Sequence, residues 1–192
     1  MNIQPITLEG RHVRLEPLAL DHLDDLCKAG LEEEIWRWLP PVRTADEMRA
    51  WIETGLRDQA NGVAVPFATR HLASGRFVGS TRYANIDRAH RRVEIGWTWI
   101  ARDWQRTAVN TDAKYLMLRH AFETWGCIRV ALKTDSLNER SRKAILRLGA
   151  KEEGIFRNHM VMPSGRIRHS VYFSIIDSEW PAVKARLEAM LA

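Results

Sequence analysis

The stretch that decides the fold runs from Val93 to Phe122 and reads VEIGWTWIARDWQRTAVNTDAKYLMLRHAF. Residues 93–100 have the pattern of a buried strand, 102–109 that of a short loop, and Asn110 to roughly Trp125 that of an amphipathic helix. The first N–H groups of a helix have no partner within it, and the helix dipole adds partial positive charge there. This strand, loop and helix start therefore predict a site for an anion such as a phosphorylated cofactor.

Two details of this stretch lead to further expectations. With the period of two that a strand imposes, one face carries Glu94, Gly96 and Thr98. The other face then carries Val93, Ile95, Trp97 and Trp99. At the helix start, Asn110 is a favourable N-cap residue, and Asp112 suits the helix dipole but would place a negative charge near bound phosphates.

The composition is that of a soluble globular protein. Of 192 residues, 45% are apolar and 28% charged, so we expect one mixed α/β domain over residues 1–192. The net charge of +5 favours an anionic ligand, but the basic residues are scattered, which argues against nucleic-acid binding. No apolar run is long enough for a signal peptide or a membrane span, so a cytoplasmic location is expected. Cys27 and Cys127 lack metal-type spacing, which predicts reduced, buried thiols and no metal site.

The rest of the chain supplies strands and helices around this centre. Alternation predicts strands at 8–18, 65–71, 76–86, 91–100, 128–133, 154–162 and 166–176, with the last two paired around Pro163-Ser164-Gly165. Helices are expected at 19–29, after a Thr44/Glu47 capping box, at 138–148, and after a Ser178 cap. Gly79 inside a strand indicates a bulge or a close backbone approach. The expected fold is a central, mostly antiparallel, splayed sheet of about seven strands flanked by helices.

Five motifs in this order resemble a known family. They are LEGRHVRLEPL (8–18), VEIGWTWI (93–100), WQRTAVNTDAKYLMLRHAFE (104–123), Asn138 with SRKAILRLGA (141–150), and DSEW (177–180). Together the chain resembles the GNAT superfamily of acyl-CoA-dependent N-acyltransferases, in the branch of RimJ/RimL-like ribosomal-protein N-terminal acetyltransferases. The resemblance implies an acetyltransferase that uses acetyl-CoA and a peptide or small-molecule amine acceptor. It also makes a homodimer a candidate assembly, because many relatives form dimers.

The resemblance also suggests which residues would bind the cofactor. The family's loop has Gln or Arg, two residues, Gly, one residue, then Gly or Ala. In this chain the loop begins with Gln105, but Ala108 and Asn110 replace the two glycines. Carried over position by position, the resemblance implies contacts with acetyl-CoA from Trp99, Ile100, Gln105, Arg106, Thr107, Ala108, Val109, Asn110, Thr111, Asn138 and Lys143. Without bound cofactor, the loop would be an ordinary strand-to-helix connection.

Catalytic candidates follow from the same comparison. Glu94 occupies a strand position at which several members carry a carboxylate, and it could act as a base through a water molecule. It could equally form a cross-strand ion pair with Arg82, Arg91 or Arg129. Ser141 is the hydroxyl available to the leaving thiolate, or it could hydrogen-bond the backbone in the first turn of its helix.

The acceptor and two other functions remain open at this level. Trp36, Trp38, Trp97 and the 159–168 hairpin could form an aromatic acceptor pocket or simply pack in the core. A CoA-binding regulator or scaffold without catalysis is the alternative that the missing glycines favour. A basic protein that contacts RNA is another alternative, and it would show steeply salt-dependent binding.

Overall fold

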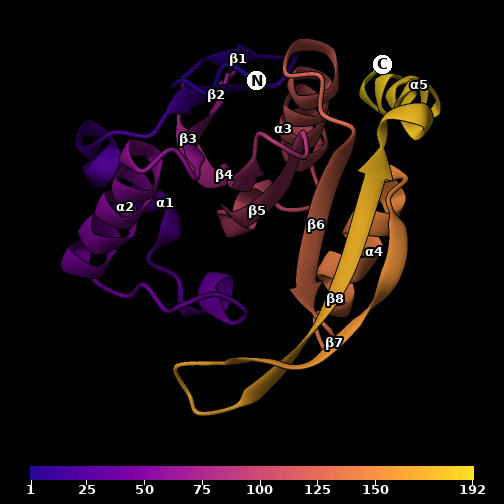
Figure 1. Cartoon of the computed structure of the whole chain (residues 1–192). Coiled ribbons are helices and arrows are strands. Elements are labelled where there is room, and N and C mark those ends of the chain that lie inside the picture. The colour runs from indigo at the N-terminus through magenta and orange to yellow at the C-terminus, as the bar shows by residue number, and fades with distance from the viewer.

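The computed structural model describes residues 1–192 and contains one eight-stranded sheet with helices on both faces (Figure 1). The strand order is β1-β2-β3-β4-β5-β6-β8-β7. The strands are β1 (Leu8–Glu9), β2 (Val13–Pro17), β3 (Val65–His71), β4 (Phe77–Asp87), β5 (Arg92–Ile100), β6 (Arg129–Asp135), β7 (Lys151–Val161) and β8 (Ile167–Ile176). The helices are α1 (Leu23–Gly30), α2 (Ala45–Ala60), α3 (Ala108–Arg119), α4 (Glu139–Leu148) and α5 (Trp180–Leu191).

The expected fold class is confirmed. All neighbouring strands pair antiparallel except β5 and β6, which are parallel. The eighth strand arises because the segment predicted as one strand at 8–18 is two strands, β1 and β2, which pair antiparallel with each other. The first long helix, α2, begins with the predicted capping box, in which Thr44 and Glu47 exchange side-chain hydrogen bonds with each other's backbone N–H.

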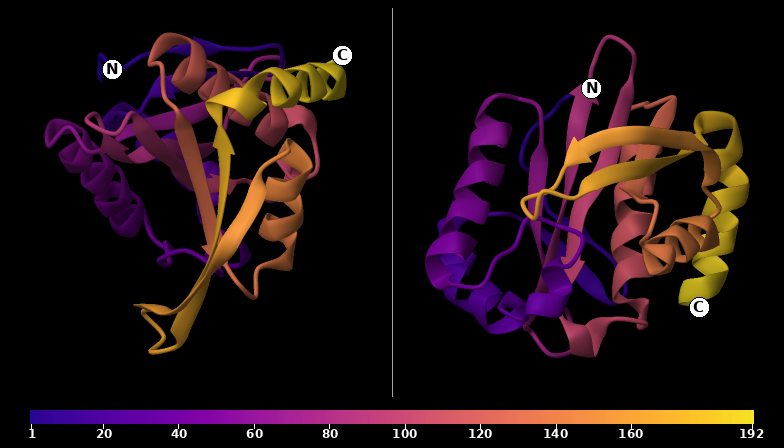
Figure 2. Two further views of the ribbon diagram at one scale, coloured as in Figure 1. Left: turned by 45° about the vertical axis from the view of Figure 1, so that its right-hand side comes forward. Right: turned by 90° about the horizontal axis from the view of Figure 1, so that it is seen from below.

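Each face of the sheet has its own apolar core. The larger core lies between the sheet and α3, α4 and α5, and it includes Leu116, Met117 and Phe173. The smaller core lies under α1 and α2, where Met48 and Ile52 pack near Trp99. The two helix layers hold the sheet from both sides, as Figures 1 and 2 show. The residues between the two layers are therefore held rigidly, which is the condition for a precise site on β5.

The parallel pair β5 and β6 separates soon after it begins. Only Arg92 to Glu94 pair with Arg129 to Ala131, and no ladder bonds continue beyond them. The two strands diverge below this short contact (Figure 1). The backbone of β5 from Ile95 onward is consequently open on the side that faces β6.

A β-bulge in β5 corrects the expected side-chain alternation. The register with β4 shifts between Ser80 and Arg82, so that Trp97 and Thr98 together oppose Thr81, and Trp97 has a φ of 52°. A bulge adds one residue to a strand and therefore reverses the facing of every residue after it. Thr98 consequently lies on the α3 side, opposite to the face expected for it.

The same bulge moves the tryptophans to the face of Glu94. Trp97 packs against Trp51 of α2, and Trp99 packs against Trp36 in the 3-10 turn at Glu33–Trp36. The prediction that Gly96 shares a face with Glu94 holds, because both precede the bulge. The predicted close approach at Gly79 is also confirmed, since a Cβ atom placed there would lie 2.3 Å from the carbonyl oxygen of Trp99.

Helix α3 begins earlier than expected, and its π-helical continuation ends at Thr124, close to the expected end at roughly Trp125. Its N-cap is Thr107, whose hydroxyl accepts a hydrogen bond from the N–H of Val109, so the prediction of Asn110 as the cap is wrong. Arg106 adopts the left-handed conformation, with a φ of 64°, and turns the chain. The helix therefore begins at Ala108, two residues before Asn110, with Thr107 as its N-cap. A π-helical turn at His120–Thr124 follows the helix.

Asp112 does not face the proposed phosphates. Its carboxylate is buried and accepts hydrogen bonds from the backbone N–H groups of His12, at 2.6 Å, and Val13, at 3.0 Å. It therefore joins α3 to the start of β2. Because two N–H donors at the start of β2 hold the carboxylate, we do not expect its charge to repel a bound phosphate.

The C-terminal part forms the predicted hairpin of β7 and β8, which extends beyond the body of the molecule (Figure 2). The prediction of a Ser178 cap is wrong, because α5 follows a short 3-10 turn at Asp177–Glu179 without a side-chain cap. The carboxylate of Glu179 instead accepts a hydrogen bond from the N–H of Ile176. Cys127 is buried and Cys27 half-buried, and neither forms a disulfide.

None of the helices combines the length and apolar character needed to cross a membrane.

Candidate functional site

A cleft of about 500 Å³ opens where β5 and β6 separate. One wall is β5 from Ile95 to Ile100, and the other is β6 from Leu132 to Thr134. The loop residues 105–107 and one face of α4 close it from the α3 side. The parting of the two strands therefore creates the cleft, and α3 and α4 give it a closed end.

The charged side chains that line this cleft are all basic. There is no Asp, Glu or His among the lining residues. The seven basic residues are Arg106, Lys114, Lys133, Arg140, Lys143, Arg147 and Arg168. The whole chain has a net charge of only +5, so the positive charge is concentrated here far beyond the average of the protein. Such a cleft attracts ligands that carry several negative charges.

The loop after β5 is held in place from two sides. The side-chain amide of Gln105 donates to the carbonyl of Ile100 at 2.9 Å, and Arg140 of α4 donates to the Gln105 oxygen at 2.6 Å. At the start of α3, no protein group accepts the N–H of Ala108 or of Asn110. These N–H groups and the cations nearby are the kind of donors that phosphate oxygens require.

The substitution of Ala108 for the family's first glycine fits this geometry. Ala108 is the first residue of α3, and its φ is not positive. The left-handed residue of the loop is Arg106, two positions earlier. An alanine methyl is compatible with an ordinary helical backbone, so the missing glycine does not disrupt the loop.

Most of the predicted cofactor contacts lie on the cleft. Eight of the eleven line it, namely Trp99, Ile100, Gln105, Arg106, Thr107, Asn110, Asn138 and Lys143. Three do not line it: Ala108, Val109 and Thr111. Val109 is buried in the larger core, and the hydroxyl of Thr111 accepts a hydrogen bond from Arg147 at 3.2 Å. The helical period explains this, because successive residues of one turn point in different directions.

Asn138 and Ser141 lie together at the start of α4. The side chain of Asn138 caps the helix by accepting from the N–H of Ser141 at 3.1 Å. The Ser141 side chain lines the cleft, and its hydroxyl forms no hydrogen bond with the backbone. Lys143, two residues after Ser141, is 81% exposed and pairs loosely with Glu139 at 3.9 Å.

Glu94 lies beside the cleft without lining it. Its carboxylate is buried, accepts a hydrogen bond from Asn85 at 2.9 Å and forms an ion pair with Lys133 at 3.2 Å. The ion-pair partner therefore differs from the three arginines expected. Of these, Arg82 pairs with Asp58 and Arg129 pairs with Glu153. Lys133 connects Glu94 with the cleft, since its own side chain is one of the lining cations.

The predicted tryptophans divide between the core and the cleft. Trp36 is buried in the smaller core and donates from its ring N–H to the carbonyl of Gly30 at 2.6 Å. Trp38 and Trp97 line the cleft, and the guanidinium of Arg166 lies over the Trp38 ring at 5.7 Å from its centroid. The expected aromatic wall is thus formed by two of the three tryptophans.

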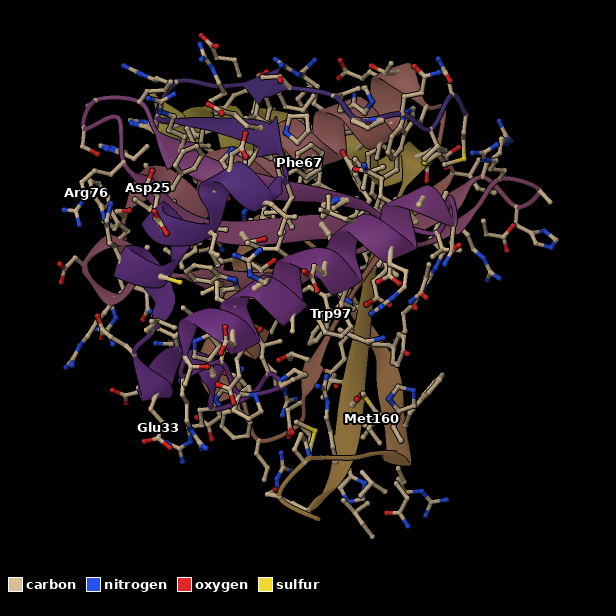
Figure 3. All side chains as sticks on the ribbon, turned by 90° about the vertical axis from the view of Figure 1, so that its left-hand side faces the viewer. Asp25, Glu33, Phe67, Arg76, Trp97 and Met160 are labelled. Atoms are coloured by element: carbon tan, nitrogen blue, oxygen red, sulfur yellow. The ribbon has the colours of Figure 1, made fainter.

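A second cavity of about 330 Å³ lies between the segment after α1 and the β7–β8 hairpin. Leu39 lines both cavities, so the two are neighbours. Figure 3 shows this side of the molecule, with Glu33 labelled on the one segment and Met160 on the other. The hairpin is fixed by Arg166 and Arg168, which both approach the buried carboxylate of Asp135.

Lys114 is a cleft residue that was not predicted from the sequence. Its amine lies 2.7 Å from the Thr98 hydroxyl and 3.0 Å from the Thr81 hydroxyl, and the side chain lines the cleft. A lysine in an amphipathic helix is ordinarily on the solvated face, so the residue type alone does not indicate a position in a cleft. The available signal was its spacing, four residues after Asn110 and thus on the same helix face as the loop.

Comparisons with known proteins agree with this geometry. Residues 12–151 match the family model described as "Acetyltransferase (GNAT) domain". The "Putative ribosomal N-acetyltransferase YdaF" of Bacillus subtilis (strain 168) is 30% identical over 176 residues, which are 88% of this chain and 92% of that protein. A GCN5-related N-acetyltransferase from Brucella melitensis superposes with a TM-score of 0.92 at 35% identity, over 98% of this chain and 86% of that one.

A further solved structure has the same fold. It is Mycobacterium smegmatis RimJ in complex with CoA-disulfide, with a TM-score of 0.84 at 21% identity over 97% of this chain and 95% of that one. The cationic cleft between diverging strands, the loop at the start of α3 and the matches over most of the chain lead to one conclusion. The chain belongs to the GNAT family of acetyltransferases.

Proposed function

We propose that the protein transfers an acetyl group from acetyl-CoA to a primary amine, which attacks the thioester directly. The acceptor is the N-terminal amine of a protein or the amine of a small molecule, and the name of the Bacillus subtilis relative favours the protein acceptor. The observation that carries the proposal is the cleft with seven cations and no acidic side chain. CoA carries several phosphate charges and a long uncharged arm, which match a basic rim and an open strand edge.

Each wall of the cleft has a part in this reaction. The N–H group of Asn110 and the arginines that line the cleft hold the phosphates. The open edge of β5 accepts the arm as an additional strand, and its N–H groups face the developing oxyanion. The Ser141 hydroxyl, which has no backbone partner, donates a hydrogen bond to the departing thiolate. The amine enters past Trp38 and Trp97 from the side of the second cavity.

The base is needed more for some acceptors than for others. An α-amino group has a pKa near ~8, so part of it is neutral at neutral pH, whereas a lysine side chain at ~10.4 is almost fully charged. Glu94 is buried beside the cleft and pairs with Lys133, whose side chain lines the cleft. We propose that it receives the proton of the attacking amine through water.

Replacing Glu94 with glutamine is expected to reduce turnover mainly at low pH. Below the pKa of the amine, a larger share of the substrate must lose a proton before it can attack, so the loss of a base is felt most there. The expected decrease is about 10-fold to 100-fold at pH 6 and much less at pH 9. The pH–rate profile of purified Glu94→Gln protein measures this, and a profile parallel to that of the wild type would exclude Glu94 as the base.

Replacing Arg140 with alanine is expected to weaken acetyl-CoA binding about 10-fold. The change removes one cleft cation and also releases Gln105, which Arg140 holds at 2.6 Å. Arg49→Ala is the matched control, because Arg49 is exposed on α2 and removes the same charge away from the cleft. Equal losses for the two variants, measured by calorimetry, would show that net charge alone determines the affinity.

The function itself is tested by release of free CoA thiol from acetyl-CoA with a panel of amines. The panel contains peptides with free N-termini, amino acids, polyamines and aminoglycosides. The proposal expects amine-dependent thiol release with at least one of them and an acetylated amine product by mass spectrometry. Saturable CoA binding without any transfer would identify a CoA-binding regulator or scaffold instead.

A further inference from the structure

Lys114 is a buried lysine without a counter-charge. Its side chain is 5% exposed, and no carboxylate lies within ion-pair distance of its amine. Burial lowers the pKa of Lys114 to about 7, and no charged neighbour contributes to this shift. An ammonium group in such a place lowers the stability of the fold unless it has a use, because desolvation is not offset by a partner.

The hydrogen bonds of Lys114 leave one donor free. An ammonium group has three N–H donors, and two of them reach the hydroxyls of Thr98 and Thr81. The two hydroxyls lie 2.8 Å apart, and each also lies 3.4 Å from the carbonyl of Gly96. No protein group accepts the third N–H, and the side chain borders the cleft.

The position of Lys114 along α3 indicates which part of a ligand it meets. It lies one helical turn, about 6 Å, beyond Asn110, which lines the cleft from the first turn of α3. Its partner Thr98 lies directly after the bulge in β5, in the wall along which the cofactor arm is proposed to extend. The amine therefore faces the arm, deeper than the phosphates.

We propose that Lys114 donates its third hydrogen bond to a carbonyl or hydroxyl oxygen of the pantetheine arm of CoA. This inference rests on the proposed function, because it takes CoA as the occupant of the cleft. It explains a buried lysine that no ion pair supports. It also assigns the Thr81–Thr98 pair as the support that fixes the direction of the amine.

The test compares three ligands by calorimetry in the wild type and in Lys114→Met. CoA and 4′-phosphopantetheine contain the arm, whereas adenosine 3′,5′-bisphosphate contains phosphates without it. We expect Lys114→Met to weaken both arm-containing ligands about 10-fold and to leave the bisphosphate unchanged. Lys28→Met is the matched control, because Lys28 is 72% exposed on α1, and it should bind all three ligands as the wild type does.

The other outcomes are equally decisive. Undiminished CoA binding by Lys114→Met would overturn the inference, and so would an equal loss for the bisphosphate, which would indicate a long-range charge effect. If the wild type itself fails to bind CoA, the proposed function fails first. Circular dichroism verifies folding, and Lys114→Gln, which keeps an amide donor, provides a second variant with an expected intermediate loss.

Discussion

Alanine at position 79 is expected to lower the free energy of unfolding by about 3 kcal/mol. A Cβ atom on Gly79 would lie 2.3 Å from the carbonyl oxygen of Trp99 and 3.1 Å from the Cα of Ile100. Both are backbone atoms of β5, so no side chain can rotate to make room. The substitution therefore pushes β4 away from β5, beside the cleft where Trp99 and Ile100 lie.

Urea unfolding of two single variants, Gly79→Ala and Gly96→Ala, tests this explanation. Gly96 lies in the adjacent strand, and a Cβ atom there would meet only the end of the Glu94 side chain, at 3.2 Å. Gly96→Ala should therefore change the free energy of unfolding by less than about 1 kcal/mol. Equal effects of the two substitutions would contradict the close approach at Gly79.

Between pH 6 and pH 9, Lys114 is expected to raise the free energy of unfolding of the wild type by about 3 kcal/mol, and Lys114→Met is expected to lack this rise. The pKa of Lys114 is lowered from 10.5 to about 7 by burial. At pH 6 the amine is charged in both the folded and the unfolded protein. At pH 9 it is neutral in the folded protein and still charged in the unfolded one.

The direction in which stability changes with pH follows from the number of protons that the folded and unfolded proteins bind. Between pH 7 and 10.5 the unfolded chain binds more protons at this site than the folded protein, so stability rises with pH in this window. The stability is lost as pH falls toward the folded pKa. Methionine has no proton to gain, so the variant should be more stable than the wild type at pH 6, and this advantage should diminish by pH 9.

Guanidinium unfolding at several pH values measures the difference between the two proteins. Titrations of other groups, such as the histidines, occur in both and cancel from the comparison. Parallel stability–pH curves for wild type and Lys114→Met would contradict the assignment of a buried, unpaired amine. The stability curves and the ligand comparison above together would show whether Lys114 lowers stability and strengthens ligand binding.

Much of the fold could be predicted from local patterns. The capping box at Thr44, the hairpin around Pro163-Ser164-Gly165 and the strand, loop and helix after Val93 each depend on neighbouring residues, and the structure contains all three. The glycine at position 79 indicated a close approach, which the structure places at Trp99. These features are local, so a single sequence contains enough information to reveal them.

The faces of β5 could not be predicted correctly, because a bulge has no reliable signature in one sequence. The extra residue at Trp97 arises from the pairing of β5 with β4, which is a long-range property. It moved Thr98 to the α3 side and so created the contact with Lys114. A strict alternation therefore gave the right residues before the bulge and the wrong ones after it.

The site shows the same division between local and distant information. Eight of the eleven cofactor contacts predicted from the resemblance line the cleft, since the loop and the start of α4 are contiguous motifs. The partner of Glu94 was missed, because Lys133 belongs to β6 and meets Glu94 only where the two strands begin to separate. Concentration of seven cations on one cleft was likewise invisible in a modest net charge.

Calorimetric titration of the wild-type protein with acetyl-CoA at increasing salt tests the central claim most directly. The basic cleft predicts saturable one-to-one binding that weakens as salt rises, because salt screens attraction between the cations and the phosphates. Absence of saturable heat up to millimolar acetyl-CoA, or binding that salt leaves unchanged, would contradict the account of this cleft as the acetyl-CoA site.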